Sequence, residues 1–189
     1  MVALVMLTAL AVGLLSYTTV WSTVLPRAAQ HSALHVRVLA TTLAASVRGA
    51  REDILALKKA VAIAGIVRAQ LAGGGDPLDG TTEATWLSRI ALRFAAELAA
   101  KSSYDQLRII EAGGHELVRV DRSGPNGAIR IVPQAELQQK SDTYFAEALA
   151  TPADQVSVSP VELNQEHGAI QAPYVPVLRV AARINTPDN

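Results

Sequence analysis

The sequence predicts an α+β protein with an N-terminal transmembrane helix, and three observations lead to this prediction. Residues 1–26 contain no Asp, Glu, Lys or Arg. Apolar residues in the range Leu39–Val61 recur at steps of three and four, which is the period of an α-helix. Two runs that alternate between polar and apolar residues flank a Gly-Gly pair within Tyr104–Asp121, a pattern typical of an antiparallel β-hairpin.

Composition and missing motifs exclude several classes of protein. With 189 residues, 50% of them hydrophobic, the chain can build one sizeable core. Its formal net charge is zero and its 17 basic residues are dispersed, so nothing indicates binding to nucleic acid. Without cysteine it can form neither disulfides nor thiolate metal sites. No Gly-x-Ser-x-Gly, His-Glu-x-x-His or P-loop motif is present, so we predict neither a catalytic site nor a cofactor.

Residues 1–26 are predicted to be a membrane anchor. At ~1.5 Å per residue, such a helix covers about 37 Å, enough for a hydrocarbon layer of ~30 Å. Tyr17 and Trp21 suit an interfacial position, and Pro26 and Arg27 mark the exit. A cleaved signal peptide is disfavoured by the missing basic n-region and the long apolar run, and burial as a core helix is a further alternative. The basic residues after the run would favour a cytoplasmic soluble part, but charge alone leaves the orientation open.

A long helix is predicted over residues 27–75, weakening beyond Ala62 and ending at the loop Gly73–Pro77. Its apolar stripe would pack on a sheet or a second helix, or, because the spacing is close to that of a coiled coil, would pair two copies into a homodimer. His31 and His35 could share one helix face, but without a third ligand we interpret them as solvated and predict no metal site. The stripe consists of Leu39, Leu43, Val47, Ala50, Ile54, Leu57 and Val61.

The remaining sequence alternates between helical and strand patterns. Thr81 or Thr82 can cap a second helix. The buried face of that helix is predicted to be Trp86, Ile90, Phe94 and Leu98. After the hairpin we expect a strand at Ala128–Val132, a helix from Pro133 to Leu149, a strand at Gln155–Ser159, a polar turn at Glu162–Gly168 and a β-rich run at Tyr174–Ile184.

The hairpin register follows by counting if the two adjacent glycines are the loop residues. Arg108 then faces Arg119. Two arginines in facing positions repel each other, so this register requires an anion. The anion is either an internal carboxylate, Asp121 or Glu116, or an external ligand, and the sequence leaves both open. In this register Ala112 faces His115, Ile110 faces Leu117, and Gln106 faces Asp121; Leu107, Ile109, Val118 and Val120 form an apolar face, and Tyr104, Gln106, Arg108, Arg119 and Asp121 form the opposite one.

Three segments resemble a known family. They read YDQLRIIEAGGHELVRVD from Tyr104, LQQKSDTYFAEAL from Leu137 and SVSPVELNQEHGAIQAPYVPVLRVAARI from Ser157. Their motifs are Y-x-Q-x-R, G-x-E-x-x-R, L-Q-x-K-x-x-x-Y-F, S-x-x-x-L-N-x-E-x-G-x-I and P-x-x-P-x-x-R, in this order. The pattern is similar to that of Cache-type (PAS-like, double-Cache family) extracytoplasmic sensor domains of bacterial histidine kinases and diguanylate cyclases. The resemblance covers the range Asp53–Ile184.

The resemblance implies a fold and a location. The transmembrane helix would continue into a long helix packed on a PAS-like antiparallel sheet, with residues 76–189 as the sensor module. That module would lie in the periplasm, anchored in the bacterial inner membrane, as the input domain of a two-component or related signal-transduction receptor. Relatives continue with a further hairpin and a transmitter. We therefore hypothesise that the chain is the N-terminal part of a longer receptor or a truncated reading frame without an output module, so that the sheet is incomplete and Val177–Ile184 presents an unpaired edge.

The resemblance also implies a small ligand on one sheet face, and the arginine pair suggests that this ligand is anionic. The two arginines would hold its charge by charge-assisted hydrogen bonds. Two tyrosines would supply a wall and hydroxyl groups, a lysine would add a donor, and an Asn and a Glu would shape the loop above the sheet. The candidate site residues are Arg108, Arg119, Tyr104, Lys140, Tyr144, Asn164 and Glu166.

The chain departs from the family pattern at three positions. Thr143 stands where an arginine is frequent, Gln171 where an acidic residue is frequent, and Arg183 where proline is usual. Each change alters charge near the expected site, so the ligands of relatives cannot be carried over. The alternative function is an interaction module without a ligand, whose helical stripe makes a dimer or contacts a partner receptor.

Overall fold

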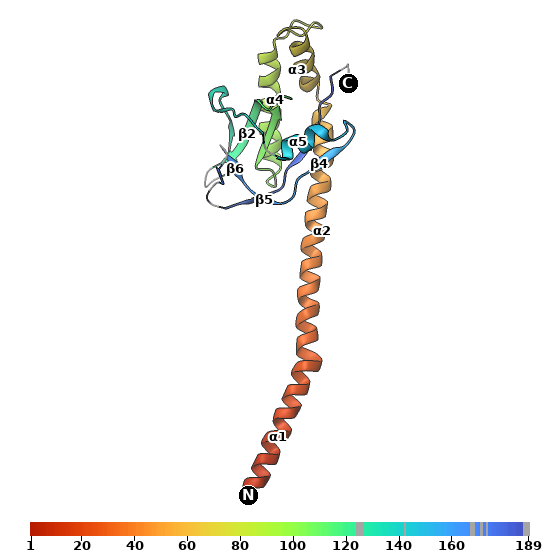
Figure 1. Ribbon diagram of the computed structural model, residues 1–189, viewed down its shortest axis with the longest axis vertical. Coiled ribbons are helices and arrows are strands. Elements are labelled where there is room, and N and C mark those ends of the chain that lie inside the picture. The colour runs from red at the N-terminus through yellow and green to blue at the C-terminus, as the bar shows by residue number, and fades with distance from the viewer. Residues whose placement is uncertain (124–126, 142, 167–168, 171, 173, 187–189) are drawn as a thin grey trace. The chain divides into compact units, whose positions relative to one another are not determined.

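The computed structural model of the chain describes residues 1–123, 127–141, 143–166, 169–170, 172 and 174–186, with the side chains of residues 23–31 and of Glu166 left undescribed (Figure 1). It contains two compact units, Met1–Val47 and Arg48–Asn189.

The first unit is helical. It comprises α1 (Val2–Thr19), the π-helical segment η1 (Val20–Val24) and the first part of α2 (Leu25–Lys58). The stretch Val2–Ser22 has a mean hydropathy of 1.9 and none of it is buried, so by length and composition it can cross a membrane. The N-terminal position of this stretch is also where a signal sequence would lie.

The π-helical segment has a local cause in the sequence. Pro26 has no backbone N–H, so it cannot donate to the carbonyl of Ser22 as a regular helix requires. The wider π-helical turn before the proline accommodates the missing hydrogen bond, and the helix continues through Pro26 into α2.

The long helix predicted over residues 27–75 is interrupted. It ends at Lys58, and α3 (Val61–Leu71) begins after Ala60, whose φ of −63° and ψ of 141° are extended. Only the C-terminal part of the predicted stripe is buried: Leu57 is 8% exposed, whereas Leu39 is 56% exposed. The prediction for Val61 was wrong, because the break rotates its side chain into solvent.

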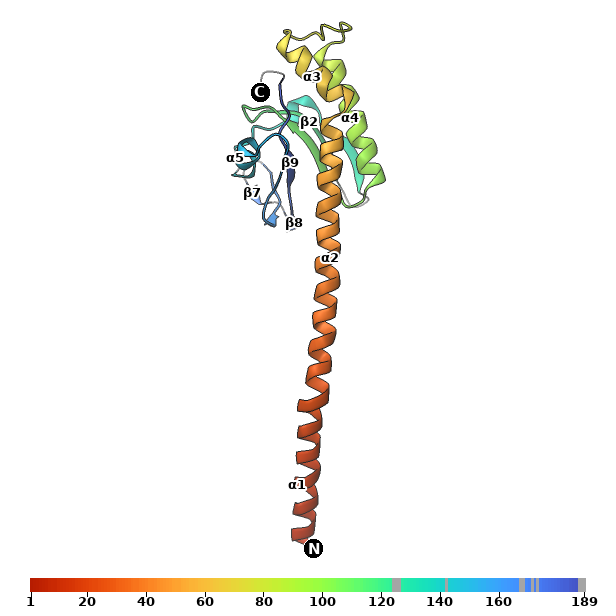
Figure 2. The same cartoon turned by 90° about the vertical axis from the view of Figure 1, so that its right-hand side faces the viewer.

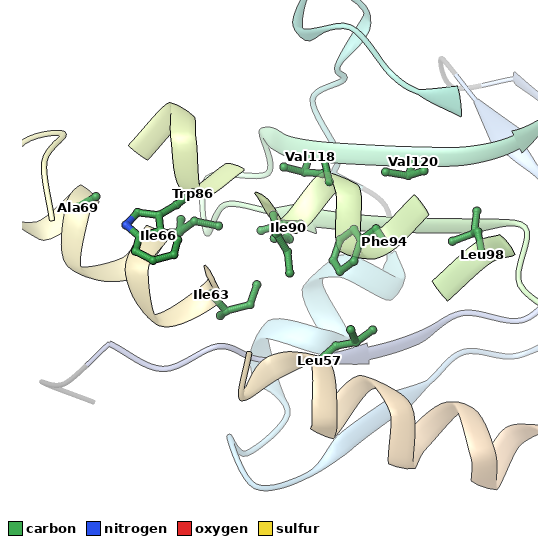
Figure 3. Close-up of a cluster of buried hydrophobic side chains, with 12 residues drawn as sticks. Leu57, Ile63, Ile66, Ala69, Trp86, Ile90, Phe94, Leu98, Val118 and Val120 are labelled. Carbon is green, nitrogen blue, oxygen red and sulfur yellow. The ribbon is translucent and has the colours of Figure 1, made fainter. Parts of the chain in front are cut away.

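Helix α3 packs on α4 (Glu83–Ala100) at close range (Figure 2). A Cβ at Gly65 would lie 2.3 Å from the Trp86 ring, so glycine is required for this approach. Thr82 caps α4 as expected by accepting the N–H of Thr85 at 3.3 Å. The predicted face of α4 is confirmed: Trp86, Ile90, Phe94 and Leu98 are all buried (Figure 3).

A three-stranded antiparallel sheet covers the other side of this core. Its strands are β1 (Gln106–Ile110), β2 (Glu116–Ser123) and β3 (Ala128–Ile131), in the order β1-β2-β3. The predicted apolar face of the hairpin is confirmed, since Val118 and Val120 are buried in the same cluster as the α4 side chains (Figure 3). The opposite face of the sheet carries the arginine pair.

The C-terminal third is built from short elements. The helix expected from Pro133 is confined to a 3₁₀ turn, η2 (Gln134–Glu136), and to α5 (Thr143–Ala150), because Leu137 is extended. Among the described residues, the last strand bonds to β4 alone, which leaves its other edge unpaired, as expected of an incomplete sheet. His167, Gly168, Gln171 and residues 187–189, all named in the sequence-based expectations, lie outside the described residues. The strands are β4 (Val156–Val158), β5 (Glu162–Leu163), β6 (Gln165–Glu166), β7 (Ala169–Ile170), β8 (Pro176–Val177) and β9 (Val180–Ala182), paired as β4-β9, β5-β8 and β6-β7.

The connection between α3 and α4 is organised by Asp76. Arg68 donates from Nε and Nη2 to its two carboxylate oxygens at 2.9 and 2.6 Å. The N–H of Leu78 donates to the same carboxylate at 3.1 Å. The Arg68 guanidinium is the main cause that lowers the pKa of Asp76 to about 2.

This lowered pKa predicts a loss of stability in acid. In the unfolded chain an aspartate titrates near about 3.9, so the contribution of the Asp76 carboxylate is complete above that pH. It is lost as the pH falls towards the folded pKa of about 2. We expect thermal unfolding of the full chain in detergent, followed by circular dichroism, to show a smaller acid-induced decline for Asp76→Asn than for the wild type. Asp79→Asn, in the same loop, should keep the wild-type decline, and equal slopes for Asp76→Asn and wild type would contradict the prediction.

Candidate functional site

The predicted strand register of the hairpin is confirmed along most of its length. Arg108 faces Arg119, Gln106 faces Asp121, and the apolar pairs between them are as expected. The predictions for Ile110 and Ala112 were wrong, because Ile110 faces Glu116 and not Leu117, and Glu111, not Ala112, lies opposite His115. The register shifts by one residue between Ile109 and Ile110.

A longer turn and a bulge together explain the shift. The loop has three residues, Ala112–Gly114, closed by a hydrogen bond of 2.8 Å from the N–H of Glu111 to the carbonyl of His115. Gly114 alone of the two glycines has a positive φ, 91°. The added loop residue moves the register by one, and the bulge at Leu117 on β2 moves it back. The two displacements cancel, so the arginines still face each other.

The bulge turns Glu116 onto the arginine face. In an unbroken strand Glu116 would share the core face with Val118 and Val120. Its carboxylate is instead 2.8 Å from Nη1 of Arg108 and 3.6 Å from Nη1 of Arg119. The side chain of Glu116 is 0% exposed. An internal carboxylate therefore relieves the repulsion between the facing arginines, which is the first of the two possibilities that the sequence left open.

Asp121 holds the second arginine from the opposite side. Nε of Arg119 donates to both oxygens of Asp121, at 3.1 and 2.9 Å. Gln106 donates to the same carboxylate at 2.5 Å. Arg119 therefore lies between two carboxylates, with its guanidinium fixed in orientation.

Lys140 joins this cluster from the segment after η2. It is buried, and its Nζ donates to Oε1 of Gln138 at 2.8 Å. The N–H of Gln138 in turn donates to Oε2 of Glu116 at 3.0 Å. The N–H of Lys140 donates to the carbonyl of Gly114 at 2.7 Å, which fastens the segment to the hairpin turn. We refer to Gln106, Arg108, Glu116, Arg119, Asp121, Gln138 and Lys140 as the sheet cluster.

Tyr104 lies apart from the arginines. Its ring packs against the hydrophobic core, and its hydroxyl donates to Asp53 on α2. Burial, and then the hydrogen bond to Asp53, raises the pKa of Tyr104. Burial by itself would raise the pKa of Asp53, but the hydrogen bonds from Lys101 and Tyr104 outweigh it and keep that pKa below its ordinary value. Because β1 begins only at Gln106, the strand alternation does not extend to Tyr104.

The other predicted residues lie on the C-terminal elements. The half-buried Tyr144 on α5 has the guanidinium of Arg179 stacked over its ring, 4.7 Å from the centroid. Arg179 also donates to Glu162 at 3.0 Å. The backbone N–H of Asn164 donates to the carbonyl of Val175 at 3.0 Å. Glu166 contributes a backbone pair with Ala169.

Sequence reasoning missed two residues that hold the predicted ones, Gln138 and Arg179. Gln138 donates its N–H to Glu116 and accepts from Lys140, and Arg179 covers Tyr144. Glu116, which binds the arginine pair, was one of the two internal carboxylates that the sequence allowed. Both missed residues are fixed positions of the quoted motifs, so the motifs were the signal that could have identified them. Among the described residues, no three His, Asp or Glu side chains gather closely enough to hold a metal ion.

Comparison with solved structures identifies the fold. The extracellular domain of vpHK1S-Z8, a protein assigned as a histidine kinase, matches with a TM-score of 0.58 and 21% identity, over 70% of this chain and 43% of that one. A domain of a sensory box/GGDEF family protein from Vibrio parahaemolyticus matches with a TM-score of 0.58 and 19% identity, over 70% of this chain and 45% of that one. The chain thus spans less than half of each solved domain.

Sequence comparison identifies the family. No curated protein matches the chain. The family model described as the sensor domain of bacterial histidine kinases matches residues 88–189, which include the sheet cluster and make up more than half of the chain. The chain therefore belongs to the family of bacterial histidine kinase sensor domains.

Proposed function

We propose that this chain is the ligand-sensing input domain of a membrane-anchored bacterial receptor of the histidine kinase or diguanylate cyclase type. The family membership and the N-terminal apolar helix support this proposal. The soluble part would lie in the periplasm, with the helix in the inner membrane, in keeping with a solved neighbour that is itself an extracellular domain. The chain would bind and not catalyse, since its matched region is a sensor domain.

The sheet cluster is the observation that supports an anionic ligand. Its described side chains include three cations, Arg108, Arg119 and Lys140, and two carboxylates, Glu116 and Asp121. These groups are at most slightly exposed, so their charges act through a lower effective dielectric than in water. A small anion on this face would meet guanidinium groups that the carboxylates already hold in place.

The internal carboxylates also limit the expected affinity. An incoming anion must share Arg119 with Glu116 and Asp121 and cannot meet a bare guanidinium. The Coulombic gain is then partly offset by repulsion between the ligand and these two carboxylates. Binding should therefore be modest and should weaken with added salt.

Calorimetry tests this proposal. The full chain in lipid nanodiscs would be titrated with acetate, succinate and inorganic phosphate, and at least one should bind. Arg119→Ala should weaken that binding by about tenfold or more, which corresponds to ~1.4 kcal/mol. Lys140→Met provides a second variant that removes a cation but no strand residue. Arg93→Ala is the matched control, because this exposed arginine lies on α4 and pairs with Glu97, away from the polar face of the sheet. Unchanged affinity in Arg119→Ala and Lys140→Met, or binding of none of the three anions, would overturn the anion proposal.

A second candidate function is a dimerisation or interaction module without a ligand. The pairing of both arginines with internal carboxylates favours it. So does the exposure of Leu39 and Leu43 on α2, which carry the predicted coiled-coil stripe. A chain that runs as a dimer in nanodiscs and binds no anion in the same calorimetry would support this candidate over the first.

A further inference from the structure

We infer that helix α2 is fixed to the sensor domain through Asp53, and that Arg122 on β2 determines the strength of this contact without touching Asp53. No direct bond joins the two residues among the described contacts; the α4–β1 connection joins them. The role of this network in signalling rests on the proposed sensory function. The network itself can be tested without any ligand.

The contact on α2 is a single carboxylate with two donors. Nζ of Lys101 lies 2.7 Å from Oδ1 of Asp53, and the hydroxyl of Tyr104 donates to Oδ2. Both donors come from the short connection between α4 and β1. The Asp53 carboxylate is ionised at neutral pH, as an aspartate ordinarily is, so both hydrogen bonds are charge-assisted. The position of α2 at Asp53 therefore depends on where this connection lies.

Arg122 fixes the same connection from the sheet. Its Nη2 donates to the carbonyl of Leu98 and, at 3.1 Å, to that of Lys101, and its Nε donates to the carbonyl of Tyr104 at 3.2 Å. A guanidinium here satisfies carbonyls that the end of α4 leaves without helical partners. The N–H of Arg122 also donates to the carbonyl of Asp105 at 2.7 Å. One side chain thus positions the backbone of both residues that hold Asp53.

Arg122 directly follows a member of the sheet cluster. Asp121, the preceding residue on β2, binds Arg119 and Gln106 on the polar face. Successive side chains of a strand point to opposite faces, so Arg122 projects towards the helices. A displacement of β2 at Asp121 therefore moves Arg122 with it. This strand is the physical link between the candidate ligand face and α2.

A second polar contact of α2 is independent of this network. Nζ of Lys58 donates to the carbonyl of Ala153, after α5, at 2.6 Å. It shares no described partner with Arg122 or Asp53. It therefore serves as the comparison for testing whether Arg122 acts through Asp53 or only by general destabilisation.

Hydrogen exchange measured by mass spectrometry on the full chain in nanodiscs, without ligand, tests the inference. We expect Asp53→Asn and Arg122→Gln each to speed exchange of the α2 amides at residues 50–58 by about tenfold or more. Combining these two substitutions should speed exchange no further, because both weaken the same contact between Asp53 and the α4–β1 connection. Combining Arg122→Gln with Lys58→Met should multiply the two single effects. Glu52→Gln, an exposed carboxylate next to Asp53, is the matched control and should leave exchange unchanged.

If Arg122→Gln disrupts folding, Tyr104→Phe tests the same contact in its place. It removes one hydroxyl, keeps the buried ring, and should speed exchange of the same amides several-fold. Wild-type exchange at residues 50–58 in Arg122→Gln or in Tyr104→Phe would overturn the inference, as would a multiplied effect in Asp53→Asn/Arg122→Gln. Because no ligand is present, failure of the anion proposal leaves these outcomes unaffected.

Discussion

Replacement of Glu116 by glutamine is expected to lower the free energy of unfolding by about 3 kcal/mol. The substitution keeps the size of the side chain and removes the buried charge that lies between Arg108 and Arg119. The two guanidinium groups then face each other across the ladder without the negative charge between them, and the glutamine amide offers one neutral oxygen in place of two charged ones. Denaturant unfolding of the full chain in detergent, followed by tryptophan fluorescence, measures the change.

Glu111→Gln is the matched control for this substitution. Glu111 is an exposed glutamate in the same hairpin, so its loss of charge should change stability by no more than about 0.5 kcal/mol. Equal small effects of the two substitutions would show that the carboxylate of Glu116 is dispensable for folding. The arginine pair would then need another source of compensation.

Gly114→Ala is expected to destabilise the protein by about 3 kcal/mol, for two reasons that add. Its φ of 91° is unfavourable for any residue with a Cβ. A Cβ would also lie 2.2 Å from the carbonyl oxygen of Lys140, a backbone atom that cannot move away cheaply. Thermal unfolding by circular dichroism measures the loss.

Gly113→Ala provides the comparison within the same turn. Gly113 has no atom within 4 Å of its Cβ position, and its φ lies outside the left-handed region. This variant should therefore unfold close to the wild type. If Gly113→Ala proved to be the more damaging of the two, the assignment of the turn would be wrong.

The sequence predicted the hairpin well because its signal is local. Alternation fixes which residues share a face, and that was enough to place Arg108 opposite Arg119 and to bury Val118 and Val120. The sheet face on which Glu116 lies could not be predicted from alternation. It depends on a bulge and on a segment more than twenty residues further along the chain, whose Gln138 N–H reaches back to the carboxylate.

Other differences also arise from tertiary context. The break between α2 and α3 could not be predicted from the sequence, because it contains no glycine or proline. Its residues Lys59 and Ala60 are compatible with a continuous helix. The packing of α3 against α4 through Gly65 and Trp86 instead determines where α2 ends. Tyr104 departs from the arginine face because it precedes the strand and serves the core and Asp53.

Because of the extra residue in β2, the number of residues in this hairpin determines which side chains reach the polar face, as much as their chemical type does. Leu117 compensates for the three-residue loop and also rotates a carboxylate out of the hydrophobic interior. Deleting His115 would let the strand run on in the same register without a bulge, and Glu116 would then point in among the valines although no acidic residue had been removed. Homologues should therefore conserve the residue count of this segment more strictly than the side chain at position 117, and a gap there in an alignment would mark a domain with a different polar surface.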